Sequence, residues 1–305
     1  MHRRWTHATI ALAALALAAT ACNSGTNNDN GAPAASTSPP APVNAVAVDA
    51  IDYGYSVSGP VKAGITKLTF TNKGQDFHML AISRIKPGKS AADILAVLKT
   101  QQDEKDDSTV FVEASPDIAG VPQVLTPGAT TTTYPNLGAG SYGLICFFPS
   151  KTNGEPHFTL GMISQLTVQP ELSETTAPQA AGEVSTTDTA LTLPDLSSGK
   201  GTYKYANHGA QSHALLFVQL HDGKTLADAI KWFDDYFQAK TKLEARPGEV
   251  WGGVEEVQHG ASTYFEINLP PGHYWAIDTA SKGEGDGQEY FRDKNGKLRA
   301  EFTVT

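Results

Sequence analysis

The chain has 305 residues, with 23 Lys plus Arg against 32 Asp plus Glu and a net charge of −9 at pH 7. This acidic balance argues against a protein that binds nucleic acid, since such proteins depend on clustered positive side chains. The length exceeds that of a typical single domain and favours two.

The first 22 residues have the pattern of an export signal. Arg3 and Arg4 supply positive charge, residues 10–19 form a short apolar run, and small residues precede Cys22. The apolar run is too short and wrongly flanked for a stable membrane span. Small residues directly before a cysteine resemble a bacterial lipobox, which implies a lipid on Cys22 and an extracytoplasmic protein anchored to the cell membrane. The alternative is a soluble secreted protein that is cut near Ala21.

Residues 23–44 are Asn, Ser, Ala and Pro with almost no bulky apolar side chains. A segment of this composition cannot bury enough apolar surface to fold. We interpret it as a disordered tether between the membrane and the folded part of the chain.

The rest of the chain contains one pattern twice. The segment NKGQDFHMLAI, which begins at Asn72, matches NHGAQSHALLF, which begins at Asn207, at an offset of 135 residues. Further on, GSYGLI matches GHYWAI at an offset of 132. Landmarks that keep nearly constant spacing over a whole half indicate an internal duplication. We predict two homologous domains, 45–169 and 183–305, with a linker at 170–182.

Each half is expected to consist mainly of strands. Apolar runs punctuated by Gly, Pro and Asn predict an antiparallel sandwich. One helix is expected in each half, with Ser90 and Thr225 as N-caps and an Asp three residues after each, near the positive helix end. The predicted fold class is therefore all-β, as two tandem sandwiches with one inserted helix each. The strands predicted in the first half are 66–71, 79–85, 129–135, 141–148 and 163–168.

The first half carries the side chains of a metal site. Cys146 is the only cysteine outside the export signal, so it cannot form an internal disulfide. His157 lies on the loop after it, Met162 begins the next strand, and His78 starts a strand far upstream. Two imidazoles, a thiolate and a thioether are the ligands of a blue-copper electron-transfer site.

The run YGLICFFP, followed by His and then Met, resembles the last-strand signature of the cupredoxin family, which includes plastocyanins, azurins and copper nitrite reductases. The resemblance implies a cupredoxin-like Greek-key sandwich in each half. It also implies one copper ion in the first half, with His78, Cys146 and His157 as equatorial ligands and Met162 as the axial ligand. Ten residues separate Cys146 from His157, which is more than in the small cupredoxins, although nitrite reductases also have a longer loop. A degenerate site and another metal such as zinc remain open, but a thioether is not a usual zinc ligand.

The second half lacks the thiol. Asp278 stands at the position that matches Cys146, and no His or Met follows at the required spacing, although His213 matches His78. We therefore expect the second domain to be a degenerate copy without a copper site.

The residues favour a non-enzymatic function. None of the nine histidines forms the His-x-His pairs of multicopper oxidases, and Ile145 stands where nitrite reductases have a His before the cysteine. The main hypothesis is a membrane-anchored electron-transfer protein with an unknown redox or copper-exchange protein partner. Two alternatives are a copper chaperone or storage lipoprotein and a metal-free binding or structural lipoprotein.

Overall fold

The computed structural model describes residues 44–59, 61–100, 120–237, 244–279 and 297–305. The predicted signal at 1–22, the lipidation site Cys22 and the tether up to residue 43 lie outside the described residues. All the described residues belong to one compact unit. Within them, no helix combines the length and the apolar character needed to cross a bilayer. The division into domains at 45–169 and 183–305 stays a prediction.

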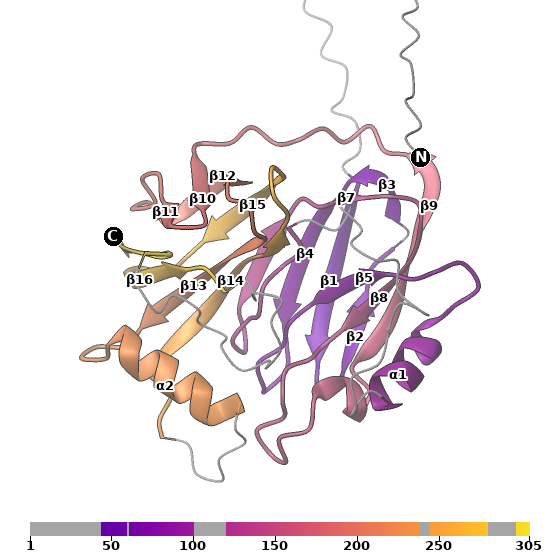
Figure 1. The fold of residues 1–305 in the computed structure, drawn as a ribbon, viewed down its shortest axis with the longest axis horizontal. Coiled ribbons are helices and arrows are strands. Elements are labelled where there is room, and N and C mark those ends of the chain that lie inside the picture. The colour runs from indigo at the N-terminus through magenta and orange to yellow at the C-terminus, as the bar shows by residue number, and fades with distance from the viewer. Residues whose placement is uncertain (1–43, 60, 101–119, 238–243, 280–296) are drawn as a thin grey trace, which may run out of the picture. The chain divides into compact units, whose positions relative to one another are not determined.

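The first half contains two sheets and the helix α1 (Ala91–Thr100) (Figure 1). Along one sheet the strand order is β2-β1-β4-β6, and along the other it is β5-β8-β9-β3-β7. The strands are β1 (Ala45–Ile51), β2 (Gly54–Val57), β3 (Val61–Ile65), β4 (Lys67–Asn72), β5 (Ala81–Arg84), β6 (Thr130–Thr133), β7 (Asn136–Leu137), β8 (Gly140–Ile145) and β9 (Ile163–Leu172).

The second half has a similar make-up, with the helix α2 (Leu226–Phe237) and sheets ordered β11-β10-β12-β15 and β14-β13-β16-β17. Its first sheet joins the first sheet of the other half, because Phe265 and Glu266 of β15 pair with Thr133 and Thr132 of β6. The strands are β10 (Glu183–Thr187), β11 (Ala190–Thr192), β12 (Lys200–Asn207), β13 (His213–Leu220), β14 (Gly248–Val257), β15 (Ser262–Asn268), β16 (Gly272–Ile277) and β17 (Arg299–Val304).

The all-β prediction is confirmed, but the sheets are not purely antiparallel. The pairs β1–β4, β3–β9 and β10–β12 are parallel. In the first half the reason is the path of the chain. After β2, the strand β3 lies in the other sheet, so β4 returns beside β1 in the same direction.

Alternation of apolar side chains builds the core of the first half. Every second residue of β1 and β4 is buried, as expected for strands with one face against a core. Val48 and Phe70 are fully buried, and they share one apolar cluster with Leu144 of β8 and Leu166 of β9. The two sheets therefore pack face to face.

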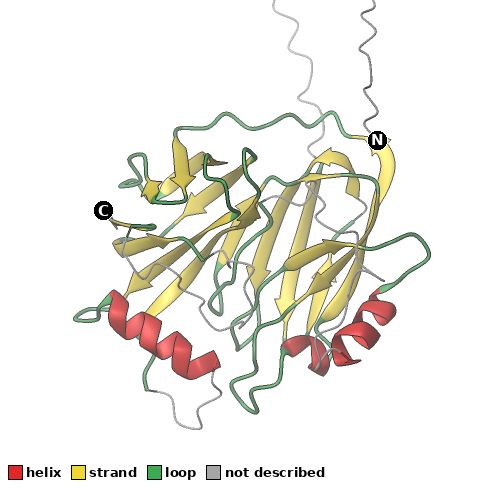
Figure 2. Cartoon of the chain, in the orientation of Figure 1, coloured by secondary structure: helices red, strands yellow, loops and turns green. Residues whose placement is uncertain are grey.

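Both helices, drawn in red in Figure 2, begin directly after the predicted caps, α1 at Ala91 and α2 at Leu226. The Asp93 carboxylate accepts hydrogen bonds from the backbone N–H (2.9 Å) and the hydroxyl (2.7 Å) of Ser90. Asp228 accepts the same two bonds from Thr225, at 2.8 and 2.7 Å. These bonds satisfy donors at the helix entry, and each carboxylate lies near the positive end of its helix.

The two halves are also joined by α2. We use the name aromatic cluster for Phe77, Phe148, Trp232, Phe233 and Tyr236. The ring of Phe77 lies 5.6–5.8 Å from each of the other four, centroid to centroid. Because three members come from α2, the helix packs on the first half directly beside the residue that precedes His78.

Candidate metal centre

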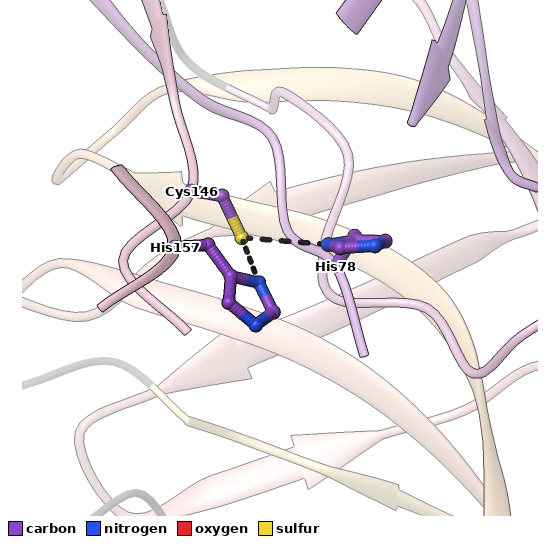
Figure 3. Close-up of side chains that lie close together, drawn as sticks. All are labelled: His78, Cys146 and His157. Atoms are coloured by element: carbon purple, nitrogen blue, oxygen red, sulfur yellow. Dashed lines mark hydrogen bonds between the residues drawn. The ribbon is translucent and has the colours of Figure 1, made fainter. Parts of the chain in front are cut away.

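His78, Cys146 and His157 come together in the first half. His78 follows the turn after β4, Cys146 follows β8, and His157 begins a short 3₁₀ helix, His157–Leu160. The sulfur of Cys146 lies 3.9 Å from Nδ1 of His78 and 3.4 Å from Nδ1 of His157 (Figure 3). The three potential ligand atoms lie within 4.8 Å of one another, and all three residues are fully buried.

Asn72 shapes the turn that carries His78. Its side-chain amide donates to the carbonyl oxygens of Asp76 (2.8 Å) and Leu125 (2.9 Å), and its Oδ1 accepts from the N–H of Gly74 at 2.9 Å. Asn207 makes the corresponding bonds in the second half. These bonds account physically for the repeated Asn-x-Gly.

Gly74 leaves no room for a side chain. A Cβ built on it would lie 2.3 Å from Oδ1 of Asp52 and 2.5 Å from Nε2 of His78. Asp52 and His78 are themselves joined, since Nε2 of His78 donates to Oδ1 of Asp52 at 2.6 Å. The glycine therefore lets the backbone pass next to this pair.

Gly74→Ala is expected to lower the free energy of unfolding by about 1–3 kcal/mol, because the added methyl group must push apart the Asp52–His78 pair. Urea denaturation checks the stability, and copper titration checks whether His78 is still correctly placed. Gly88→Ala is a control with open space around the added Cβ, although its positive φ of 80° adds backbone strain. An unchanged unfolding midpoint and copper affinity in Gly74→Ala would contradict this steric account.

Backbone hydrogen bonds hold Cys146, His157 and Met162 near one another. The N–H of Cys146 donates to the carbonyl of Met162 (3.2 Å), and the N–H of Met162 donates to the carbonyl of His157 (3.0 Å). Met162 is fully buried in the same apolar cluster as Cys146. Its role as the axial ligand, like the ligand roles of the other three residues, stays a prediction.

Burial disfavours the charged forms of Cys146 and His78. Burial raises the pKa of the Cys146 thiol to about 12, despite hydrogen bonds from the backbone N–H groups of Met79 and Phe148 and from the hydroxyl of Tyr55. Burial also lowers the pKa of His78. A soft cation bound here would displace the thiol proton and meet a thiolate and a neutral imidazole, which are the forms that bind metals. The donor set therefore fits a transition metal that accepts both nitrogen and sulfur.

The other ring nitrogen of His157 faces a carboxylate. Nε2 has no hydrogen-bond partner among the described residues, and Oδ2 of Asp76 lies 3.6 Å away. Asp76 accepts hydrogen bonds from the Tyr236 hydroxyl (2.8 Å) and the Lys151 N–H (3.2 Å). Burial alone would raise the pKa of Asp76, but its interactions with His157, Tyr236 and Lys151 hold it at about 2. Tyr236 of α2 thus contacts Asp76, the carboxylate next to His157.

Sequence reasoning missed these surrounding residues. One of them carried a signal, because Asp52 and Asp188 occupy matching places in the two halves and each contacts the matching histidine. A self-comparison extended upstream of Asn72 would have found the pair. Nothing in the spacing of Asp76 or Tyr236 points to the site.

In the second half an ion pair stands where the first half has the thiol. Nδ1 of His213 is hydrogen-bonded to the carboxylate of Asp278, and Nε2 contacts Oδ1 of Asp188 at 3.1 Å. Asp278 also accepts the N–H of Ala214 at 3.0 Å. The matching imidazole therefore lies between two carboxylates.

No protein-family model and no curated protein matches the chain. Among solved structures, a reduced auracyanin from the photosynthetic bacterium Roseiflexus castenholzii is 21% identical and covers 42% of this chain and 98% of its own, with a TM-score of 0.28. A multicopper oxidase is 13% identical and covers 86% and 88%, with a TM-score of 0.24. A copper nitrite reductase from Nitrosomonas europaea is 12% identical and covers 86% and 93%, with a TM-score of 0.22.

These comparisons correct the prediction that the chain is not an enzyme. The similar structures include multicopper oxidases and copper nitrite reductases, which are enzymes. The prediction was based on the missing His-x-His pairs and on Ile145. These two features argue only against the second copper sites of multicopper oxidases and nitrite reductases, and they do not exclude other reactions. The prediction is withdrawn. The chain is an all-β sandwich protein with a buried His-Cys-His group.

Proposed function

We propose that the chain is a copper-binding protein of the cupredoxin type that transfers electrons through one copper ion in its first half. The proposal rests on one observation. Three fully buried side chains, His78, Cys146 and His157, place two Nδ1 atoms within 3.9 Å of one sulfur. Soft sulfur favours Cu(I) and imidazole accommodates Cu(II), so this set suits both oxidation states.

The protein residues have defined tasks in this proposal. His78, Cys146 and His157 would hold the ion, and Met162 would be a fourth ligand. Copper supplies one-electron chemistry when bound. The chain contributes ligands fixed by backbone hydrogen bonds and a site closed to water, which keeps reorganisation small when an electron moves. Full burial of all three residues favours electron transfer over delivery of copper to another protein.

The cellular setting is part of the proposal and derives from the sequence. The export pattern at 1–22 and the lipid attachment at Cys22 would place the protein outside the cytoplasm on the cell membrane, where it would meet a redox partner protein. An internal duplication would explain the two halves, and the matching bonds of Asn72 and Asn207 support it.

The test is visible absorption of residues 23–305 after addition of Cu(II). We expect an intense blue thiolate-to-copper band in the wild type and complete loss of the band in Cys146→Ser, because only a thiolate gives this transition. Far-UV circular dichroism controls for folding of the variant. If the wild type shows no band and binds neither Cu(II) nor Cu(I) tightly, the proposed function is wrong.

A further inference from the structure

The metal centre has no ligand at the surface. The four residues proposed to hold copper are all fully buried, namely His78, Cys146, His157 and Met162. A redox partner therefore cannot touch a ligand directly. Because electron transfer weakens steeply as the path lengthens, the residues that link the ligands to the surface decide where exchange occurs.

His78 reaches the surface through Asp52. Its Nε2 donates to Oδ1 of Asp52 at 2.6 Å. Nδ1, which faces the sulfur, is joined to Nε2 through a single ring carbon, so the path consists of part of one ring and one short hydrogen bond. Asp52 lies between β1 and β2 and its side chain is 28% exposed. The path from this buried imidazole therefore ends in solvent.

His157 reaches the same turn through Tyr53, the residue after Asp52. The ring centroids of Tyr53 and His157 lie 4.7 Å apart, and the tyrosine is half-buried. Its hydroxyl lies 3.3 Å from Oγ of Ser150. Both imidazoles thus have their outward contacts in the two residues between β1 and β2.

The second half closes another side of His157. Nε2 of His157 faces Oδ2 of Asp76 at 3.6 Å, and the Tyr236 hydroxyl lies 2.8 Å from Oδ1 of that carboxylate. Asp76 is 3% exposed and Tyr236 of α2 is 4% exposed. A path in this direction therefore ends in buried side chains rather than in solvent.

Phe147 offers a rival route. It follows Cys146 directly and is 41% exposed, with its ring against that of Phe158 at 5.6 Å between centroids. The path from the sulfur runs through the cysteine side chain, a peptide bond and the phenylalanine side chain. It is covalent but longer than the path through His78, which therefore should dominate.

We propose that electrons enter and leave the copper through the turn between β1 and β2, by way of His78 and Asp52. This inference rests on the proposed function and adds the place where the redox partner docks. The partner loses one electron as Cu(II) becomes Cu(I), or gains it in the reverse step, and no covalent bond forms or breaks. The second half then has a task, since α2 covers the side of His157 that points away from this turn.

Gln75 and Ala210 are matched places for a test charge. The N–H of Gln75 donates to Oδ2 of Asp52 at 2.8 Å, and the N–H of Ala210 donates to Oδ2 of Asp188 at 3.0 Å. Both residues are exposed, and both bonds are made by the backbone, so a new side chain leaves them in place. Ala210 belongs to the half that lacks the thiol.

The experiment follows oxidation of the Cu(I)-loaded chain at low salt by two reagents, the trication tris(phenanthroline)cobalt(III) and the trianion hexacyanoferrate(III). We expect Gln75→Lys to slow oxidation by the cation and to speed oxidation by the anion, by about threefold each, because the new charge lies where the reagents must dock. Gln75→Glu should do the reverse. Ala210→Lys and Ala210→Glu change the net charge equally and should keep both rates close to those of the wild type.

A change of reduction potential gives a different pattern. It would raise or lower both oxidation rates together, whereas a charge at the docking place moves them in opposite directions. The potential and the blue band of each variant are measured as well. Both should stay close to wild-type values, because Gln75 contacts Asp52 through its backbone.

A second measurement locates the reagent without electron transfer. Tris(phenanthroline)chromium(III) is a redox-inert, paramagnetic analogue of the cobalt reagent, and it broadens the NMR signals of nearby N–H groups. In the metal-free chain it should broaden the signals of Asp52, Tyr53 and Gln75. Sharp signals from these three residues, at a concentration that broadens others in the first half, would overturn the inference.

The rates can also contradict it. Equal changes in the Gln75 and Ala210 variants, or no change in either pair, would overturn the inference and leave the proposed function intact, since the chain would still be blue and exchange electrons. Slower oxidation by both reagents in Phe147→Leu, with the Gln75 variants at wild-type rates, would assign the exchange to Phe147 instead. Absence of a blue band in the wild type would overturn both the inference and the proposed function.

Discussion

Replacing Phe77 by alanine is expected to lower the free energy of unfolding by about 3–5 kcal/mol, the cost of deleting a well-packed phenylalanine ring. Phe77 is only 3% exposed and lies at the centre of the aromatic cluster. The guanidinium of Arg246 also lies 5.3 Å from its ring centroid. Loss of the Phe77 ring therefore removes contacts on both sides of the junction between the first half and α2.

The same substitution should weaken the coupling between the halves. We expect a single calorimetric transition in the wild type and two separated transitions in Phe77→Ala. Phe217→Ala is the matched control, since its ring is buried within the core of the second half, against Phe265 and Phe302. It should cost a similar free energy without separating the transitions. A loss below about 1 kcal/mol in Phe77→Ala, the size of an average substitution, would contradict this account.

Replacing Asp278 by alanine is expected to cost about 3 kcal/mol below neutral pH, the lower end for breaking a buried ion pair, because Asp188 still lies beside His213 in the variant. Asp278 and His213 are each 4% exposed. The substitution also leaves the N–H of Ala214 without its acceptor. The measurement is urea unfolding of the wild type and the variant.

The loss should depend on pH. Burial lowers the pKa of His213, but the hydrogen bonds and charges of Asp278 and Asp188 outweigh it, so the pKa is raised overall. A group whose pKa is raised on folding adds stability that is fully present below its unfolded pKa of about 6.5 and is lost as pH rises through the folded pKa. The difference between wild type and Asp278→Ala should therefore shrink as pH rises through that range.

The variant Asp278→Asn tests the charge alone, because asparagine keeps the shape of the aspartate side chain. The amide oxygen still accepts the N–H of Ala214, but the negative charge is gone, so we expect an intermediate loss of stability. If the three proteins keep the same differences at every pH, the histidine is not charged in the folded state and the ion-pair interpretation is wrong.

The sequence by itself determined the all-β class, the helix caps, the repeated Asn-x-Gly and the residues that meet at the centre. These features are local or periodic. A strand alternates, a cap needs its Asp three residues later, and Cys146 and His157 lie on one loop. The segment around His78 matches the segment around His213, so His78 could also be recognised from that match.

Only the tertiary structure decided what surrounds that centre. Tyr236 hydrogen-bonds Asp76 across 160 residues of chain, and β6 pairs with β15 of the other half. Tyr55 packs against the apolar cluster that contains Cys146, because β1 and β2 belong to one sheet and β8 to the sheet packed against it. Such contacts depend on which faces of the sheets meet and on how the helix covers them. Neither leaves a spacing or a periodicity in the amino-acid sequence.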